Sequence, residues 1–213
     1  MYRRILQWPD LRLKHISEPV SNFGNSLQEL VKDMHDTLNV VMGAGLAAPQ
    51  IDVHQSVVAI KCSVFGWVNP DPYELNSDLW VLINPELKLM EKEKMWEEAC
   101  LSVPGVVGNV RRKEKAILNY QDSQGAYHTL ELDWPISGAV QHECDHLEGK
   151  LFLDRMGKKA AGKLKKKLRR QLKLNANTGR KKLRIKKEKE LIDTRLTHGP
   201  GKRMRKKRKN RKK

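Results

Sequence analysis

The chain has 213 residues, with 42 Lys and Arg against 25 Asp and Glu, a formal charge of +17, and three cysteines. No run of about 18 apolar residues occurs, which excludes a transmembrane helix, and the N-terminal residues have the features of neither a secretory signal nor a transit peptide. Three cysteines are too few for a disulfide framework and suit a reducing compartment, so we expect a cytoplasmic protein.

Charge divides the chain into two regions. Residues 1–155 carry 15 basic and 22 acidic side chains, a net −7, whereas residues 156–213 carry 27 basic and 3 acidic, a net +24. We therefore expect a mildly acidic domain over residues 1–156 and a strongly basic extension over residues 157–213. Only the extension predicts a polyanionic partner.

The first predicted helix covers residues 26–42. Ser26 is the expected N-cap, with Glu29 at the capping-box position, and Gly43 ends the pattern. Apolar residues recur at three- and four-residue spacing along it, as an amphipathic helix requires: Leu27, Leu30, Val31, Met34, Leu38 and Val41.

Short β-rich runs follow the helix. Asn84-Pro85 is expected to end the second run, and the turn signal Asp122–Gly125 predicts an antiparallel hairpin between the last two. A helical period returns around Ser137. The expected class is α+β, with short antiparallel strands packed around one central helix. The predicted strands are residues 56–60, 79–83, 86–90, 115–120 and 127–132.

The basic extension predicts a helix with a narrow apolar stripe, formed by Leu164, Leu168 and Leu172 at four-residue spacing. Residues 175–179 are expected to interrupt this helix, and a weaker helical pattern continues from Arg180 to about residue 196. The last 12 residues, from 202 onward, are almost purely charged and are expected to be disordered when free.

Residues 141–146 read Gln-His-Glu-Cys-Asp-His and predict a metal site. On a helix, His142 and His146 project from one face about one turn apart, so both rings can hold one ion. Glu143 is close enough to take a proton from water at that ion. Two ordinary surface histidines would give the same spacing, so the motif needs a third ligand.

Three positions for a third ligand can be compared. A third histidine six residues after His146 is ruled out because Phe152 occupies that position, and no acidic residue follows Asp154 until Glu188. The remaining candidate lies upstream, at Cys100 in the segment Glu-Ala-Cys-Leu-Ser-Val-Pro-Gly. A lone cysteine is otherwise usually a small buried apolar residue.

A third segment, residues 43–50, reads Gly-Ala-Gly-Leu-Ala-Ala-Pro-Gln. Its glycines permit close backbone approach to a ligand and Gln50 offers amide donors, although a helix end running into a packed turn explains the same residues. Together, GxGxAAPQ, ExCLS and QHExDHxxG resemble the signature of peptide deformylase, and the resemblance extends from about Ile5 to Asp154. Ala99 departs from the pattern, which more often has glycine there; the change affects the loop rather than the metal ligands.

The resemblance implies an enzyme that removes the N-formyl group from the initiator methionine of new polypeptides and releases formate. It implies that Cys100, His142 and His146 bind one divalent ion, Fe(II) in the family, for which zinc, nickel or cobalt can substitute. Glu143 would then act as general base. The Gln50 side chain and the Leu101 backbone N–H would stabilise the oxyanion.

The resemblance also implies a substrate cleft. The backbone at Gly45 would align the peptide, and Gly138 and Ala139 are small enough to leave room for the methionine side chain, although packing against a strand explains both equally well. Glu98 and Asp145 flank the predicted ligands, where they either orient the ligands or are solvated surface groups.

The basic extension predicts sequence-independent contact with nucleic acid phosphates, because its charge is dense and no aromatic residues are interleaved for base stacking. Since the implied substrate is a nascent chain, ribosomal RNA is the expected partner. An anionic membrane surface is the alternative, through the leucine stripe. For the whole chain, two other classes remain: a zinc endopeptidase, and a non-catalytic RNA-binding protein with a structural metal.

Overall fold

A computed structural model describes residues 1–70, 78–90 and 92–197. The chain divides into two compact units, Met1–Lys165 and Lys166–Lys213. The boundary predicted from charge lies between residues 156 and 157 and remains a prediction. Over the described residues, no helix has both the length and the apolar character needed to cross a membrane.

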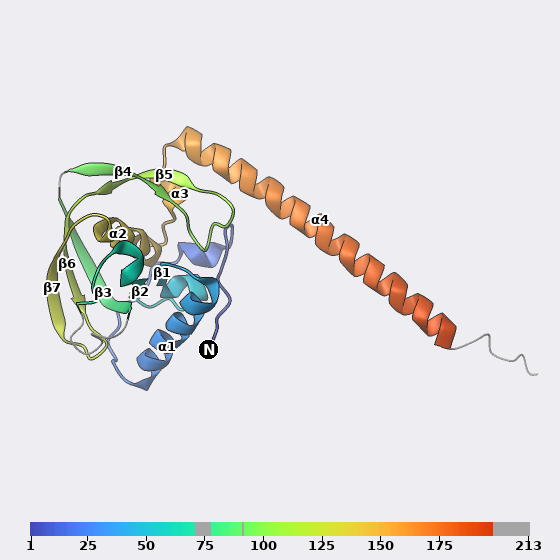
Figure 1. Cartoon of the computed structure of the whole chain (residues 1–213), viewed down its shortest axis with the longest axis horizontal. Coiled ribbons are helices and arrows are strands. Elements are labelled where there is room, and N and C mark those ends of the chain that lie inside the picture. The colour runs from blue at the N-terminus through green and yellow to red at the C-terminus, as the bar shows by residue number, and fades with distance from the viewer. Residues whose placement is uncertain (71–77, 91, 198–213) are drawn as a thin grey trace, which may run out of the picture. The chain divides into compact units, whose positions relative to one another are not determined.

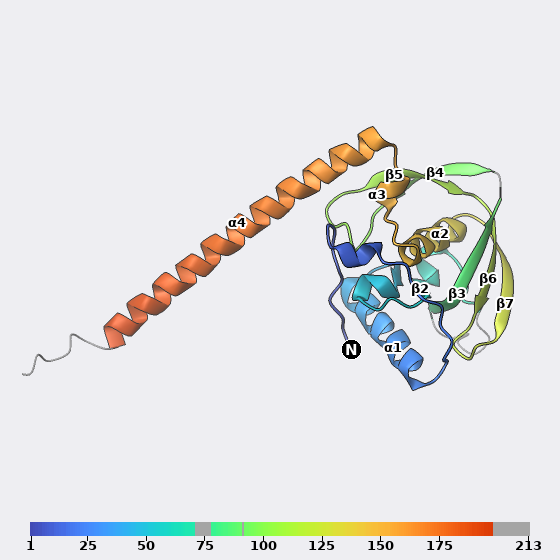
Figure 2. The same ribbon diagram turned by 180° about the vertical axis from the view of Figure 1, so that it is seen from behind.

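A five-stranded antiparallel sheet forms the larger layer of the first unit, in the order β1-β2-β3-β6-β7, and a separate ribbon pairs β4 with β5 (Figure 1). Helix α2 lies between the sheet and the ribbon, against β1, β2 and β5 (Figures 1 and 2). The mixed architecture with antiparallel strands agrees with the prediction. The strands are β1 Gly45–Ala47, β2 Val57–Lys61, β3 Leu79–Leu89, β4 Glu93–Glu98, β5 Gly108–Lys113, β6 Ala116–Gln121 and β7 Tyr127–Leu132.

The helices of the first unit cover both faces of this sheet. Alternate residues of β2 explain the arrangement: Val57 and Ala59 pack in the cluster that includes α1, whereas Val58 and Ile60 pack in the cluster that includes α2. A strand buried on both faces is expected to be mostly apolar, and β2 is apolar from Val57 to Ile60 before it ends at the half-buried Lys61. The helical segments are η1 Leu11–Lys14, α1 Asn25–Val41, η2 Ala48–Ile51, η3 Cys62–Phe65, α2 Ile136–Leu147 and α3 Phe152–Arg155, followed by α4 Lys158–Thr197.

Helix α1 lies where predicted, but its caps differ. The N-cap is Gly24, not Ser26, and the Asn22 side chain accepts a hydrogen bond from the Gly24 N–H at 2.8 Å. At the other end the helix stops at Val41, and its C-cap Met42 takes the left-handed conformation with φ of 50°, one residue before the Gly43 that was expected to end the pattern. The cap prediction was wrong because the helix begins earlier, which places Ser26 inside its first turn.

Strand β3 corrects a second prediction. Residues 79–83 and 86–90 were expected to be separate strands divided at Asn84-Pro85, but one strand runs to Leu89 with a register shift between Ile83 and Glu86. Asn84 has a positive φ of 51°, and its side chain bonds both the backbone N–H and the carbonyl of Val20, at 2.8 and 2.9 Å. The asparagine therefore bends the strand without ending it. The predicted β6–β7 hairpin is confirmed.

Strands β4 and β5 were not predicted from the sequence. They lie on either side of the Cys100 loop and carry alternating charged residues that hide a half-buried pattern, most clearly in β5. In β5, Gly108, Val110 and Arg112 are buried, Asn109 and Arg111 are exposed, and Lys113 is half-buried. Because Arg112 occupies a buried position, β5 lacks the alternation of apolar and polar residues that predicts a half-buried strand.

Helix α4 is continuous across residues 175–179, so the predicted interruption was wrong. None of these residues is proline, and asparagine, threonine and glycine cost only up to about 1 kcal/mol each inside a helix. Thr178 also bonds the Leu174 carbonyl through its hydroxyl at 2.9 Å. The prediction that residues from 202 onward are disordered falls outside the described residues.

Candidate metal centre

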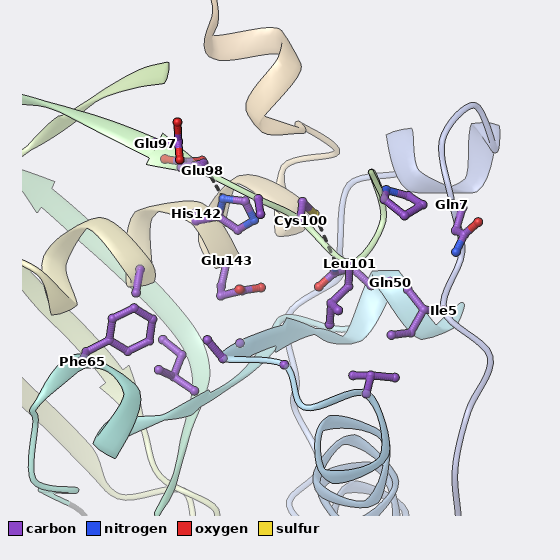
Figure 3. A pocket seen from close by; sticks show the side chains of 18 of the residues that line it. Ile5, Gln7, Gln50, Phe65, Glu97, Glu98, Cys100, Leu101, His142 and Glu143 are labelled. Atoms are coloured by element: carbon purple, nitrogen blue, oxygen red, sulfur yellow. Dashed lines mark hydrogen bonds and ion pairs between the residues drawn. The ribbon is translucent and has the colours of Figure 1, made fainter. Parts of the chain in front are cut away.

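The three predicted metal ligands lie together in the first unit. Cys100 follows β4, and His142 projects from α2 (Figure 3). His146 belongs to the same helix. Their ligand atoms all lie within 4.8 Å of one another, and all three residues are buried. Cys100 Sγ and His146 Nε2 are 3.3 Å apart. The local sequence explains the helical half of this geometry, since a four-residue step on a helix stacks two side chains on one face.

Glu98 orients the first histidine. Its Oε2 lies 2.7 Å from His142 Nδ1, which leaves Nε2 as the ring's ligand atom. Burial opposes a charge on His142, yet hydrogen bonds to Cys100 and Glu98 raise its pKa well above the usual range. The same partners that favour a proton on this ring also favour a metal cation. His146 differs, because burial and the neighbouring His142 lower its pKa well below the ordinary value.

A buried arginine links the two acidic residues that flank the ligands. Arg112 Nε and Nη1 lie 2.6 Å from Glu98 Oε1 and 2.7 Å from Asp145 Oδ2. The three side chains are only 3%, 2% and 4% exposed, and Arg155 also pairs with Asp145. Glu98 and Asp145 are therefore buried, not solvated. Sequence reasoning missed Arg112, whose one signal is a cation at an inward-facing position of β5.

Glu143 lies beside the ligands with its carboxylate toward β1 and η2 (Figure 3). Its Oε2 is buried and has no hydrogen-bond partner among the described residues, and burial raises the pKa of this carboxyl to about 7. A Cβ at Gly45 would come within 2.3 Å of Glu143 Oε1. The Glu143 carboxylate therefore occupies the space that a side chain at position 45 would fill, so this position requires glycine.

The Gln50 side chain points toward the ligands from η2, held at both ends of its amide. Its Oε1 accepts a hydrogen bond from the Ala47 N–H at 2.8 Å, and its Nε2 donates to Ser102 Oγ at 3.0 Å. Nε2 is also 3.7 Å from Cys100 Sγ. Leu101, next to the cysteine, lines the same cavity as Gln50, so the two residues predicted to stabilise the oxyanion border one space (Figure 3).

A cavity of about 660 Å³ opens beside these groups and is lined by Cys100, His142 and Glu143. Gly45 and Ala139, both predicted to contact substrate, line it as well. Gly138 is not among the described residues that line the cavity; a Cβ there would meet the Trp96 ring at 2.6 Å. Sequence reasoning also missed other members of the wall: Ile5, Gln7, Ile60, Phe65 and Trp96.

The donor set fits a divalent cation. One thiolate and two imidazoles suit Fe(II), zinc, nickel or cobalt, and three protein ligands beside a cavity leave a position open, as catalytic sites require.

The backbone explains why glycine occupies position 149, at the end of the motif. Its φ is 66°, and a Cβ there would lie 2.4 Å from the Lys14 carbonyl oxygen, so only glycine permits the chain to leave α2 in this way.

An α+β fold that buries a Cys-His-His group beside the carboxylate of a glutamate is typical of a metallohydrolase. Residues 2–161 match the protein family described as polypeptide deformylase, and the chain belongs to this family of enzymes. The reaction of the family is removal of the N-formyl group from newly made polypeptides.

Named relatives agree. Peptide deformylase 1 of Pseudomonas syringae is 39% identical over 81% of this chain and 97% of its own length, and the Chromobacterium violaceum peptide deformylase is 36% identical over 80% and 96%. Among solved structures, a Legionella pneumophila peptide deformylase superimposes with a TM-score of 0.71 at 36% identity, covering 83% of this chain and 98% of that chain. A Met-Ala-Ser-bound Acinetobacter baumannii peptide deformylase has a TM-score of 0.64 at 31% identity over 73% and 99%.

Proposed function

We propose that this enzyme hydrolyses the formyl amide of nascent polypeptides that begin with formylmethionine, in the cytoplasm, with Cys100, His142 and His146 holding its metal. The proposal is carried by the buried Cys-His-His group and by Glu143, at one wall of a cavity large enough for a peptide end. The buried Oε2 of Glu143 has no hydrogen-bond partner in the described part of the chain. A bound divalent cation, proposed as Fe(II) in the cell, supplies Lewis acidity for attack of water on the formyl carbon.

Glu143 is proposed to move the proton. Its buried carboxylate, with a pKa raised to about 7, is suited both to accept a proton from attacking water and to pass it to the leaving amine at neutral pH. Because Gly45 has no side chain, the carboxylate can lie against β1 at the edge of the cavity. The glutamate then needs no large movement between its two roles.

The Gln50 amide and the Leu101 N–H are proposed to stabilise the negative oxygen that forms on the formyl group. Two bonds hold the Gln50 amide, so it is oriented before substrate arrives. Removing one such donor typically costs about 10²–10³ in rate. Gly45 and Ala139 line the same cavity and are proposed to contact the peptide backbone and the first side chain.

The catalytic proposal is tested by formate release from a formyl-Met tripeptide, with protein purified anaerobically and loaded with Fe(II) or nickel. We expect rapid release by the wild type and loss of release in Glu143→Ala. Folded, metal-loaded protein that releases no formate would contradict the proposal. Cleavage of an unformylated peptide instead would identify a zinc endopeptidase.

We further propose that residues 157–213 bind ribosomal RNA. The supporting observation is one continuous basic helix, α4, in a segment whose net charge is positive by more than twenty. Such an extension would hold the enzyme where formylated chains emerge. An anionic membrane is the competing partner, since Leu172 and Leu174 are 40% and 65% exposed.

The extension is tested by comparing the full chain with a chain that ends at Lys165, the last residue of the first compact unit. Ribosome binding is measured by co-sedimentation at increasing salt, beside anionic vesicles. We expect the full chain alone to bind ribosomes, with affinity that falls steeply as salt rises. Equal binding by the shorter chain would refute the proposal, and binding to vesicles alone would favour the membrane.

A further inference from the structure

Two histidine side chains that the catalytic proposal does not use lie against each other in the first unit. His15 directly follows η1, and His54 lies between η2 and β2. Their ring centres are 4.8 Å apart, close to the 5.2 Å between the rings of the catalytic pair, His142 and His146. Two imidazoles that bind one ion through bonds of about 2.1 Å have ring centres about 5 Å apart. The pair of His15 and His54 therefore has the spacing of a metal-binding pair.

A carboxylate lies beside this pair. Asp52 is the C-cap of η2, and its Oδ1 is 3.7 Å from His54 Nε2, while its other oxygen pairs with Arg12. The distance of 3.7 Å is too long for a hydrogen bond. Two donor atoms that share a tetrahedral ion through bonds of about 2.1 Å lie about 3.4 Å apart, so Oδ1 and Nε2 are near the separation that one ion requires.

Hydrogen bonds do not explain where the His54 ring lies. Its Nδ1 is buried and has no hydrogen-bond partner among the residues that the structure describes. Its Nε2 faces Asp52 beyond hydrogen-bonding distance. A bound cation would give Nε2 a partner, which is the state in which neutral histidine is most often found at metal sites.

Backbone hydrogen bonds fix the two segments that carry the histidines. The Glu18 N–H donates to the His54 carbonyl at 2.9 Å, and the Ser56 N–H donates to the Glu18 carbonyl at 2.8 Å. Glu18 and Gln55 form a parallel bridge between the segments. The backbone under both rings is thus held before an ion arrives, and binding has to order only side chains.

We propose that His15, His54 and Asp52 form a second metal site, which takes a divalent transition metal of the zinc and copper class. Imidazole and carboxylate donors suit these ions. Among the described residues, only the catalytic group around Cys100 has three such donor atoms within 4.8 Å of one another. The exposed His15 ring therefore has to turn inward to close the second site, and its ion should bind more weakly than the catalytic one.

The role of this site is structural. None of its three residues is among those described as lining the catalytic cavity. An ion held there would join the segment after η1 to η2, the element that carries Gln50, whose carbonyl already accepts a hydrogen bond from the Leu6 N–H at 2.7 Å. Because the three ligands meet only in the folded chain, the ion should stabilise it against unfolding.

The site is tested first by counting zinc in the full chain after equilibrium dialysis at micromolar zinc. We expect one more ion per chain in the wild type than in His15→Gln or His54→Gln, a difference that does not depend on what the catalytic site holds. His15 is exposed, so its replacement leaves the core intact. His35→Gln is the matched control, because His35 is an exposed histidine that contacts Asn39 at 3.0 Å. Equal zinc content in the wild type and both site variants would overturn the proposal.

Copper identifies the ligands. Cu(II) added to the chain with zinc in its catalytic site should give an electron paramagnetic resonance spectrum with coupling to two imidazole nitrogens, and His15→Gln should leave one. Asp52→Asn should weaken copper binding by about 10-fold or more, since even an outer partner of a metal site typically contributes about 10–100-fold to affinity. A spectrum that His15→Gln and His54→Gln leave unaltered would show that the two rings only stack, and would refute the site.

Discussion

The two compact units use charge in opposite ways. In Met1–Lys165, 19 basic and 22 acidic residues nearly balance, and the buried Arg112 is matched to two particular carboxylates at hydrogen-bonding distance. Residues 166–213 hold 23 basic and 3 acidic side chains, with no such balance. In the first unit the effect of a charged residue depends on where it lies, so one substitution should have a large effect. In the second unit the total charge determines binding, so a single substitution should have a small effect.

The largest effect is expected from a substitution at Glu143, beside the metal ligands of the first unit. Glu143→Gln keeps the shape of the side chain but removes its ability to take a proton, so we expect kcat to fall by about 10²–10⁴. Formate release from a formyl-Met tripeptide measures this loss. Metal content should stay as in the wild type, and a variant with wild-type kcat would show that another group moves the proton.

Arg112→Leu tests the buried pairing directly. The change leaves Glu98 and Asp145 buried without their shared cation, so we expect the free energy of unfolding to fall by about 3–5 kcal/mol. Denaturant titration of the metal-free protein measures it. Arg111→Leu is the matched control on the same strand, because its side chain is 72% exposed and its contact with Glu93 is 3.7 Å long. Equal losses in the two variants would show that burial does not set the effect.

Gly45→Ala tests the position of the Glu143 carboxylate without changing the number of charged residues. The added methyl group would displace the Glu143 carboxylate, whose Oε1 would be 2.3 Å away, and misplacement by about 1 Å can cost 10²-fold in rate. We therefore expect kcat to fall by about 10² while the unfolding midpoint changes little. Gly157→Ala, where a Cβ meets nothing within 4 Å, should leave kcat unaltered. A normal rate in Gly45→Ala would mean that the carboxylate works from another position.

The smallest effects per residue are expected in the basic extension. Replacing the exposed Lys166, Lys167 and Lys173 by glutamine should lower the slope of log affinity against log salt for ribosomes by about 0.7–0.9 for each phosphate that is no longer neutralised. Turnover of a formyl-Met tripeptide should not change. The same three positions as arginine keep the charge and should keep the affinity, and a drop there would show that binding depends on position after all.

Local patterns carried most of what could be predicted about the elements. Helix α1 and the β6–β7 hairpin lie where period and turn chemistry placed them. The errors arose where tertiary contacts override a local signal. Asn84 bends β3 because its amide bonds Val20, a contact between residues 64 positions apart. Residues 175–179 remain helical because weak helix formers without proline do not stop a helix that extends on both sides.

By itself, the sequence predicted that His142, His146 and Glu143 lie together, because a helix places residues four apart on one face. It offered Cys100 as the candidate third ligand, and the resemblance to the family completed that ligand set. Only the tertiary structure decided that Arg112 joins Glu98 to Asp145, and that Gly138 makes room for Trp96 instead of lining the cavity. The physical reason is the same in both cases. These contacts join β4, β5 and α2, and a spacing along the chain does not encode which side chain of one element will fill a gap in another.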